Sequence, residues 1–354
     1  MNIKWFLQRA DRFAESAAVW DELNSRCGGL PFLDTLFIQP LLEVFGSGQE
    51  WLAIGSENDQ PVAAAILSPA GMGRWSLFQP SQMPLGPLLT LPALPLDEVA
   101  ASLLKQLPGT TLLLGLTQID PAVNAKPVNG NTFSTLDYID TAWVDISGDF
   151  ESYWASRGKN LRQNMRKQRN KLAADGIETA LDTLRDAECV IEALRQYGVL
   201  ETASWKFEGG TAVSLDNDQG RFYAAVFESF CRAGRGVIYR YRFGDHVVAM
   251  DLCIESRGLL VILKTAYDGS NKSLSPAFLM REEQFQKLFS DGRIQRVEFF
   301  GKLLEWHTRW SEEKRTLYHA NAYRYRIIPK LLEWRAKMRV GKRFKREQVV
   351  TGDA

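Results

Sequence analysis

One pattern of strands and turns occurs twice in this 354-residue chain, and it constrains the fold more than any other feature. Residues 51–89 contain two apolar runs joined by an acidic turn, then a glycine-containing turn, a third run and a segment rich in serine and proline. Residues 237–279 repeat this order of runs and turns. The two stretches share little identity, so the likeness is one of topology. A repeat of this kind favours a duplicated domain over two unrelated domains.

Charge and proline content divide the chain at the same place. Residues 1–140 hold 7 Lys and Arg against 14 Asp and Glu, whereas residues 141–354 hold 36 against 28. Twelve of the 14 prolines lie at or before Pro127. Both changes indicate a boundary near residues 125–145, and the length suits two domains with cores of their own. We expect an anionic ligand to bind the second, basic half.

Apolar periodicity and turn residues predict a mixed α+β chain in which consecutive strands pair antiparallel. The stretch 80–108 holds six prolines, so we expect loop and short helix there. The predicted helices are 11–26, 35–44, 150–174, 187–202, 220–233 and 277–288. The predicted strands are 51–55, 62–68, 74–78, 111–116, 142–146, 177–181, 236–243, 247–255, 259–267 and 296–300.

Several function classes lack their usual signals. No apolar run approaches the roughly 20 residues that cross a bilayer, and charged residues interrupt the first 15 positions, so we expect a cytoplasmic protein. The four cysteines and three histidines show no metal-ligand or disulfide spacing, and we expect no metal. Dinucleotide, P-loop, serine-hydrolase and zincin motifs are absent from the sequence.

The junction after the strand 259–267 is a candidate anion site. A loop follows this strand, and Ser275 and Pro276 then suit the N-cap and first position of a helix. Backbone N–H groups and the helix dipole at such a junction favour a pyrophosphate. The alternative is a capped helix after a β-meander with no ligand.

Two residues near the end of the second half could act as a general base. Glu298 lies in the predicted strand 296–300, and His307 lies in an aromatic turn between Trp306 and Trp310. Both residue types take up a proton near neutral pH when their surroundings shift them. The alternatives are an ion pair between Glu298 and a nearby arginine, and a histidine that only packs between aromatic rings.

The predicted helix 150–174 carries a basic face that includes Arg162, Arg166 and Arg169. It could dock an anionic acceptor, or it could be an ordinary solvated face. It has no interleaved aromatic residues, so we expect no sequence-specific nucleic-acid partner. Residues 329–354 form a second basic amphipathic pattern, which could lie on an anionic membrane surface or remain a solvated helix.

Seven segments of the second half resemble, in their order along the chain, the GNAT acyltransferases of the CelD/BcsL cellulose-biosynthesis type. The departures are Ala277, Glu298 and His307, where that family usually has glycine, aspartate and lysine. The matching segments are Phe150–Trp154, Lys159–Arg162, Arg166–Arg169, Gly244–Ala249, Ser275–Leu279, Glu298–Gly301 and Trp306–Trp310. The first half resembles the degenerate GNAT copy of Fem-type aminoacyltransferases.

This resemblance implies two tandem GNAT-like domains, each with a mostly antiparallel central sheet flanked by helices. The expected domains are 1–140, a degenerate copy; 141–328, the copy with the donor site; and 329–354, the basic tail. The donor would be acetyl-CoA or another acyl-CoA, and Glu298 or His307 would serve as the base. The implied donor-binding residues are Lys264, Thr265, Ala266, Ser275, Pro276, Ala277, Phe278 and Leu279.

The implied activity is acyl transfer to an amine or hydroxyl, with a role in exopolysaccharide or cell-envelope biosynthesis. A Fem-like transferase that uses aminoacyl-tRNA is one alternative, and an inactive GNAT pair that serves as an assembly module is another. Polysaccharide, lipid precursor and amino acid are all compatible acceptors. The basic tail allows peripheral contact with the inner membrane face.

Overall fold

The structure is a computed structural model that describes residues 2–203 and 212–331. The predicted basic C-terminal segment lies outside the described residues from position 332 onward. Within the described residues, no helix is long and apolar enough to span a membrane.

Helices and strands alternate along both halves of the chain. The helices are α1 (Ala17–Arg26), α2 (Thr35–Phe45), α3 (Leu96–Gln106), α4 (Phe150–Ser156), α5 (Lys159–Ala174), α6 (Val190–Ala203), α7 (Asp218–Arg232), α8 (Pro276–Asp291) and α9 (Glu305–Thr308). The strands are β1 (Lys4–Arg9), β2 (Trp51–Glu57), β3 (Gln60–Pro69), β4 (Arg74–Leu77), β5 (Leu88–Thr90), β6 (Leu113–Ile119), β7 (Phe133–Asp145), β8 (Thr179–Leu184), β9 (Gly236–Phe243), β10 (His246–Ser256), β11 (Leu259–Tyr267), β12 (Arg296–Glu298) and β13 (Lys314–Tyr323).

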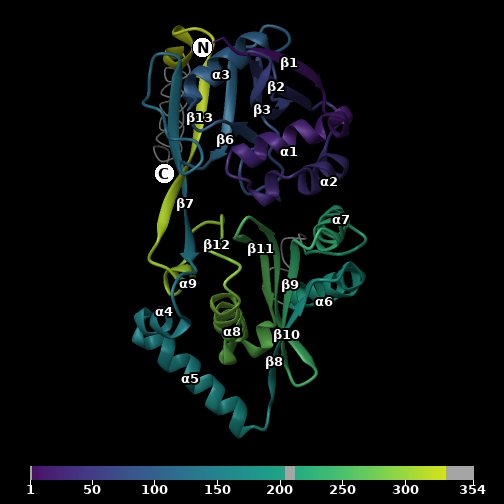
Figure 1. Cartoon of the computed structure of the whole chain (residues 1–354), viewed down its shortest axis with the longest axis vertical. Helices are drawn as coiled ribbons and strands as arrows, with labels where there is room; N and C mark the ends of the chain where they lie inside the picture. The colour runs from purple at the N-terminus through teal and green to yellow at the C-terminus, as the bar shows by residue number, and fades with distance from the viewer. Residues whose placement is uncertain (1, 204–211, 332–354) are drawn as a thin grey trace, which may run out of the picture.

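The described strands form one 13-stranded sheet flanked by helices (Figure 1). Its order is β1-β2-β3-β4-β6-β13-β7-β12-β11-β10-β9-β8, with β5 beside β3. Neighbours are antiparallel except for the pairs β4–β6 and β11–β12, which are parallel. The mixed α+β class with a mostly antiparallel sheet is confirmed.

The internal repeat is visible as two runs of strands with the same order. In the first half β2, β3 and β4 form a meander and β6 lies parallel to β4. In the second half β9, β10 and β11 form a meander and β12 lies parallel to β11. The turns at Asn58-Asp59 and Arg257-Gly258 have positive φ at both central residues, which matches the twist of paired strands in a tight hairpin.

The two halves exchange a strand at the middle of the sheet. β7 follows β6 in the chain but pairs with β12 of the second half, and β13 follows β12 but pairs with β6 of the first half. β7 and β13 also pair with each other over most of their length, so they run side by side between the halves (Figure 1). The predicted domain boundary at residues 140/141 falls inside β7 and stays a prediction.

The helices α1, α2, α6 and α7 meet between the two halves and share one core. Phe37 of α2 packs edge-on against Phe222 of α7, with ring centroids 5.2 Å apart. Phe32 meets Phe300 in the same way at 5.0 Å. Burial of aromatic rings from both halves in one core couples the halves energetically.

Some element predictions were wrong in detail. The predicted helix 150–174 is two helices, because Arg157 and Gly158 are extended, with ψ of 155° and 136°. Arg157 Nη1 there donates to the Trp310 carbonyl at 3.1 Å, which fixes the break. The proline-rich stretch 80–108 holds an 11-residue helix, α3, as well as β5. The predicted helix 11–26 begins with a 3-10 segment, Ala10–Ser16.

Candidate functional site

The parallel strands β11 and β12 diverge after three residue pairs. Their last pair is Val261 with Glu298, and the Phe299 amide then donates to the Ala142 carbonyl of β7. From Ile262 to Tyr267, β11 pairs on one edge with β10, and its other edge borders a cavity of about 700 Å³. This volume is in the usual range of small-molecule sites.

The cavity has an apolar, aromatic wall with a few cations. It is bounded by β11, by the start of α8 and by the segment that leads into α9. Its lining residues are Ile262, Leu263, Lys264, Thr265, Tyr267, Lys272, Ser275, Pro276, Ala277, Phe278, Arg281, Phe299, Gly301, Lys302, Leu304, Trp306, His307 and Trp310. Seven of the predicted donor-binding and catalytic residues are among them, and Ala266, Leu279 and Glu298 are not.

The start of α8 lies at one end of this cavity. Ser275 and Pro276 occupy the predicted N-cap and first helical positions. The N-cap position is confirmed, although Ser275 adopts the left-handed conformation (φ 53°, ψ 51°) and its hydroxyl makes no capping hydrogen bond. Its carbonyl instead accepts from the Phe278 and Leu279 amides. A non-glycine residue in this region is held there by its surroundings, often at a functional site.

The predicted donor residues of β11 point to different environments. Lys264 Nζ pairs with the buried Glu201 of α6 at 2.9 Å and lies over the rings of Tyr197 and Tyr223. Ala266 is buried beside β10. Thr265 donates through its hydroxyl to Asp251 at 2.6 Å.

A buried charge pair at the wall of the cavity was not predicted from the sequence. Arg281 of α8 pairs with Asp251 of β10 at 2.6 Å, and the side chains are 2% and 0% exposed. Arg281 also donates to the side chains of Thr265 and Gln284. The signal available in the sequence was Asp251 itself, a carboxylate in the middle of an otherwise apolar strand, because a buried charge needs a partner.

His307 is buried and lines the cavity. Its ring stacks on Trp306 with centroids 3.6 Å apart and meets the edge of Phe299 at 4.9 Å. Its Nδ1 accepts a hydrogen bond from the Leu304 amide at 2.9 Å. Burial lowers the pKa of His307 to about 4, and the charge of Arg281 contributes to this shift.

Glu298 lies outside the cavity, in a charge network between the halves. Its carboxylate meets Arg315 of β13, with Nη1–Oε1 and Nη2–Oε2 distances of 3.0 Å. Arg315 also pairs with Asp120 of the first half at 2.6 Å. Burial raises the pKa of Glu298 to about 7, against the opposing effect of Arg315. This is the ion-pair arrangement that was the alternative to a catalytic base.

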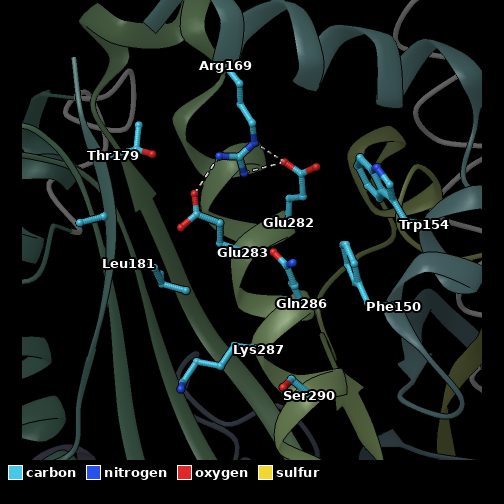
Figure 2. Close-up of a pocket in the computed structure, with 11 residues that line it drawn as sticks. Phe150, Trp154, Arg169, Thr179, Leu181, Glu282, Glu283, Gln286, Lys287 and Ser290 are labelled. Atoms are coloured by element: carbon cyan, nitrogen blue, oxygen red, sulfur yellow. Dashed lines mark hydrogen bonds and ion pairs between the residues drawn. The ribbon is translucent and has the colours of Figure 1, made fainter. Parts of the chain in front are cut away.

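The predicted acceptor-docking arginines of α5 differ in their surroundings. Figure 2 shows Arg169 reaching from α5 to Glu282 and Glu283 of α8, at 2.7 and 2.9 Å. Arg162 is half-buried and donates to the Arg157 carbonyl at 3.1 Å, whereas Arg166 is exposed. Arg169 therefore anchors α5 to α8, and Arg166 faces solvent.

In the first half, a chain segment narrows the opening that corresponds to the cavity. The parallel pair β4–β6 ends at Ser76 with Gly115. Beyond it, Gly86 passes so close that a Cβ there would lie 2.4 Å from the Leu77 side chain and from the Thr117 carbonyl. The Gly86 amide donates to the Gln118 carbonyl at 3.1 Å. This segment lies between the ends of β4 and β6, and beside it the first half keeps a cavity of about 510 Å³ whose lining includes Ser76, Leu77 and Thr117.

Comparisons with known proteins agree with this geometry. Residues 159–310 match the family model described as an acetyltransferase (GNAT) domain. The second half of the chain is therefore similar to GNAT-type acetyltransferase domains over these residues. A search of curated proteins gives no match. Among residues 2–203 and 212–331, no cluster of three or more His, Cys, Asp or Glu residues is arranged to hold a metal ion.

Solved structures are similar over most of the chain. A conserved protein of unknown function from Bacteroides thetaiotaomicron has a TM-score of 0.56 at 9% identity, covering 91% of this chain and 100% of that one. The C-terminal domain of a protein from Agrobacterium fabrum, assigned as a lysylphosphatidylglycerol synthetase, has a TM-score of 0.51 at 10% identity. This match covers 86% of this chain and 92% of that one. FemX has a TM-score of 0.51 at 7% identity, covering 80% of this chain and 90% of that one. At these identities the likeness is one of fold, and it extends over both halves of the chain.

Proposed function

We propose that this protein transfers an acyl group from a coenzyme A thioester to an amine or hydroxyl, and that the donor binds in the cavity between β11 and β12. The observation that carries this proposal is the position of Ile262 to Tyr267 of β11, which pair with β10 on one edge and border on the other a cavity lined by the start of α8. An extended pantetheine chain can pair with such an edge as a further strand would. The diphosphate then meets the positive end of the α8 dipole.

The cavity offers cations for the donor's phosphates. Two lysines line the cavity: Lys272 comes from the segment 269–274, and Lys302 from the segment 299–304. Ala277, in the first turn of α8, is small enough to let a ligand approach the backbone. The aromatic rings that complete the wall suit the apolar parts of the donor.

In the reaction, the acceptor nitrogen or oxygen attacks the thioester carbonyl carbon. A C–N or C–O bond forms and the C–S bond breaks, the acceptor loses a proton, and the coenzyme A thiolate leaves. The protein's part is to hold the carbonyl against the acceptor and to stabilise the negative charge that develops on its oxygen.

The acceptor and the cellular role extend this proposal. The motif resemblance to the CelD/BcsL type favours an envelope or exopolysaccharide precursor, and the exposed basic face of α5 at Arg166 favours an anionic one. A cytoplasmic location and contact with the membrane through the basic tail remain predictions.

Calorimetric titration of the full chain with acetyl-CoA and with charged tRNA tests the donor. We expect acetyl-CoA to bind. Ala277→Trp should weaken this binding at least tenfold, because the indole would occupy the space through which the ligand approaches the first turn of α8. Ala174→Trp, at the exposed end of α5, is the matched control and should bind as the wild type does. Binding of charged tRNA without binding of acetyl-CoA would favour the Fem-like alternative and reject this proposal.

A further inference from the structure

His307 and Leu304 are joined by two reciprocal hydrogen bonds. The His307 amide donates to the Leu304 carbonyl at 3.0 Å, and the Leu304 amide donates to His307 Nδ1 at 2.9 Å. This is half of a capping box: the histidine side chain bonds back to the N-cap amide, as a glutamate or glutamine does, whereas the N-cap leucine offers only its backbone carbonyl to the His307 amide. The imidazole is thereby fixed by the backbone at one of its two nitrogens.

This contact determines the tautomer of the ring. An amide N–H can only donate, so Nδ1 must keep its lone pair free to accept. A neutral imidazole carries its single proton on the other nitrogen, which is Nε2 here. His307 lines the cavity, and Nε2 is the nitrogen left to meet a ligand there as a donor. A ring in this state cannot take a proton at Nε2.

The surroundings of the ring keep it neutral. Trp306 and Phe299 cover it, and the positive charge of the Arg281 guanidinium of α8 acts on it. Desolvation and this positive charge both oppose a second proton on the imidazole. A neutral N–H donor aimed at a developing oxyanion needs no rearrangement at the moment of reaction.

We infer that His307 donates a hydrogen bond from Nε2 to the carbonyl oxygen of the bound thioester, and that it is an electrophilic group rather than the general base. The contact with the thioester rests on the proposed function, which supplies the ligand. The tautomer of the His307 ring does not depend on it. With Nδ1 occupied by Leu304 and Glu298 held by Arg315, the proton of the acceptor passes to solvent water.

The first test needs no ligand. Nitrogen-15 NMR of the histidine-labelled full chain reports which ring nitrogen carries the proton, and the signals of His307 are assigned by their loss in His307→Gln. We expect the Nε2–H tautomer, unchanged between pH 5.5 and 8. A proton on Nδ1, or an imidazolium at neutral pH, would overturn the inference.

The second test uses acetyl-CoA labelled with carbon-13 at the thioester carbonyl. We expect its infrared C=O band to move to lower frequency when bound to the wild type, and to lose this shift in His307→Ala. His307→Gln, which retains an N–H donor, should restore part of the shift. Where transfer is measured, loss of one such donor should lower kcat by roughly 10²–10³-fold without moving the pH profile.

The outcomes separate the two proposals. Acetyl-CoA that binds with the same C=O band in wild type and His307→Ala overturns the role of His307 and leaves the donor site standing. If the wild type does not bind acetyl-CoA, the proposed function is rejected, and the contact between His307 and the thioester carbonyl is rejected as well. Because the Ala variant could misfold, the wild-type Nε2–H resonance is also followed during titration with acetyl-CoA. An unmoved resonance at saturation counts against the contact.

Discussion

Arg315 on β13 holds the carboxylate of Glu298 on β12 through both of its terminal nitrogens, at 3.0 Å each. Because the same guanidinium binds Asp120 of the first half, this contact ties together strands from both halves at the point where they are exchanged. The side chains of Glu298 and Asp120 are 4% and 1% exposed. Removal of one partner from such a network leaves a buried charge without compensation.

The first prediction concerns the pH dependence of stability. The pKa of Glu298 is raised from its ordinary 4.5 to about 7, so the folded state holds this proton more tightly than the unfolded state. Its contribution is fully present below pH 4.5 and is lost as pH rises through 7. We expect the wild type to lose on the order of 3 kcal/mol more unfolding free energy than Glu298→Gln over this range. Urea unfolding at pH 4.5, 6 and 8 measures the difference. Parallel curves for the two proteins would contradict the prediction.

The second prediction concerns the buried pair Asp251–Arg281. Asp251→Ala and Arg281→Ala should each lower the unfolding free energy by about 3–5 kcal/mol, because each leaves a charge buried alone. The double variant Asp251→Leu, Arg281→Met should lose much less than the sum of the two. A double-mutant cycle by urea unfolding measures the coupling. Additive losses would show that the pair is not coupled as its 2.6 Å contact requires.

The third prediction concerns the segment around Gly86, which narrows the opening in the first half. Gly86→Ala should cost about 1–3 kcal/mol, because the added Cβ meets the Thr117 carbonyl and the Leu77 side chain. Gly130→Ala is the matched control, since nothing lies within 4 Å of its Cβ, and it should stay within about 0.5 kcal/mol of the wild type. Thermal unfolding distinguishes the two. Equal midpoints would mean that the segment around Gly86 yields freely.

The fourth prediction concerns the basic helix α5. Arg169→Ala should destabilise the contact of α5 with α8 by about 1–3 kcal/mol, because it leaves Glu282 and Glu283 without their shared partner. Arg166→Ala removes an exposed charge and should leave stability unchanged while it weakens any binding of a polyanion such as heparin. Limited proteolysis within α5 and a heparin column report the two effects separately. Faster cleavage of Arg166→Ala than of Arg169→Ala would reverse the assignment.

The parts of the fold that could be predicted are those fixed by local sequence. The turns at Gly244-Asp245 and Arg257-Gly258 define the hairpins β9–β10 and β10–β11, since only certain residues accept their backbone angles. The exchange of β7 and β13 between the halves could not be predicted from the sequence, because the pairing partner of a strand depends on contacts with residues far away along the chain. The break at Arg157-Gly158 depends on the Trp310 carbonyl, more than 150 residues away.

The candidate site divides in the same way. Ser275, Pro276 and His307 could be placed from local pattern, and all three line the cavity. The left-handed backbone of Ser275 and the pairing of Glu298 with Arg315 are set by the tertiary structure. The tautomer of His307 was readable in principle, since a side chain three residues after a helix N-cap often bonds back to it.

Hydrogen exchange measured by mass spectrometry, with and without acetyl-CoA, tests the position of the donor site most directly. The β11–β12 cavity predicts slower exchange in residues 262–267 and in the first turn of α8 when acetyl-CoA is added, with no change in residues 74–87 of the first half. Protection confined to the first half, or none in the second half at saturating acetyl-CoA, would contradict the account.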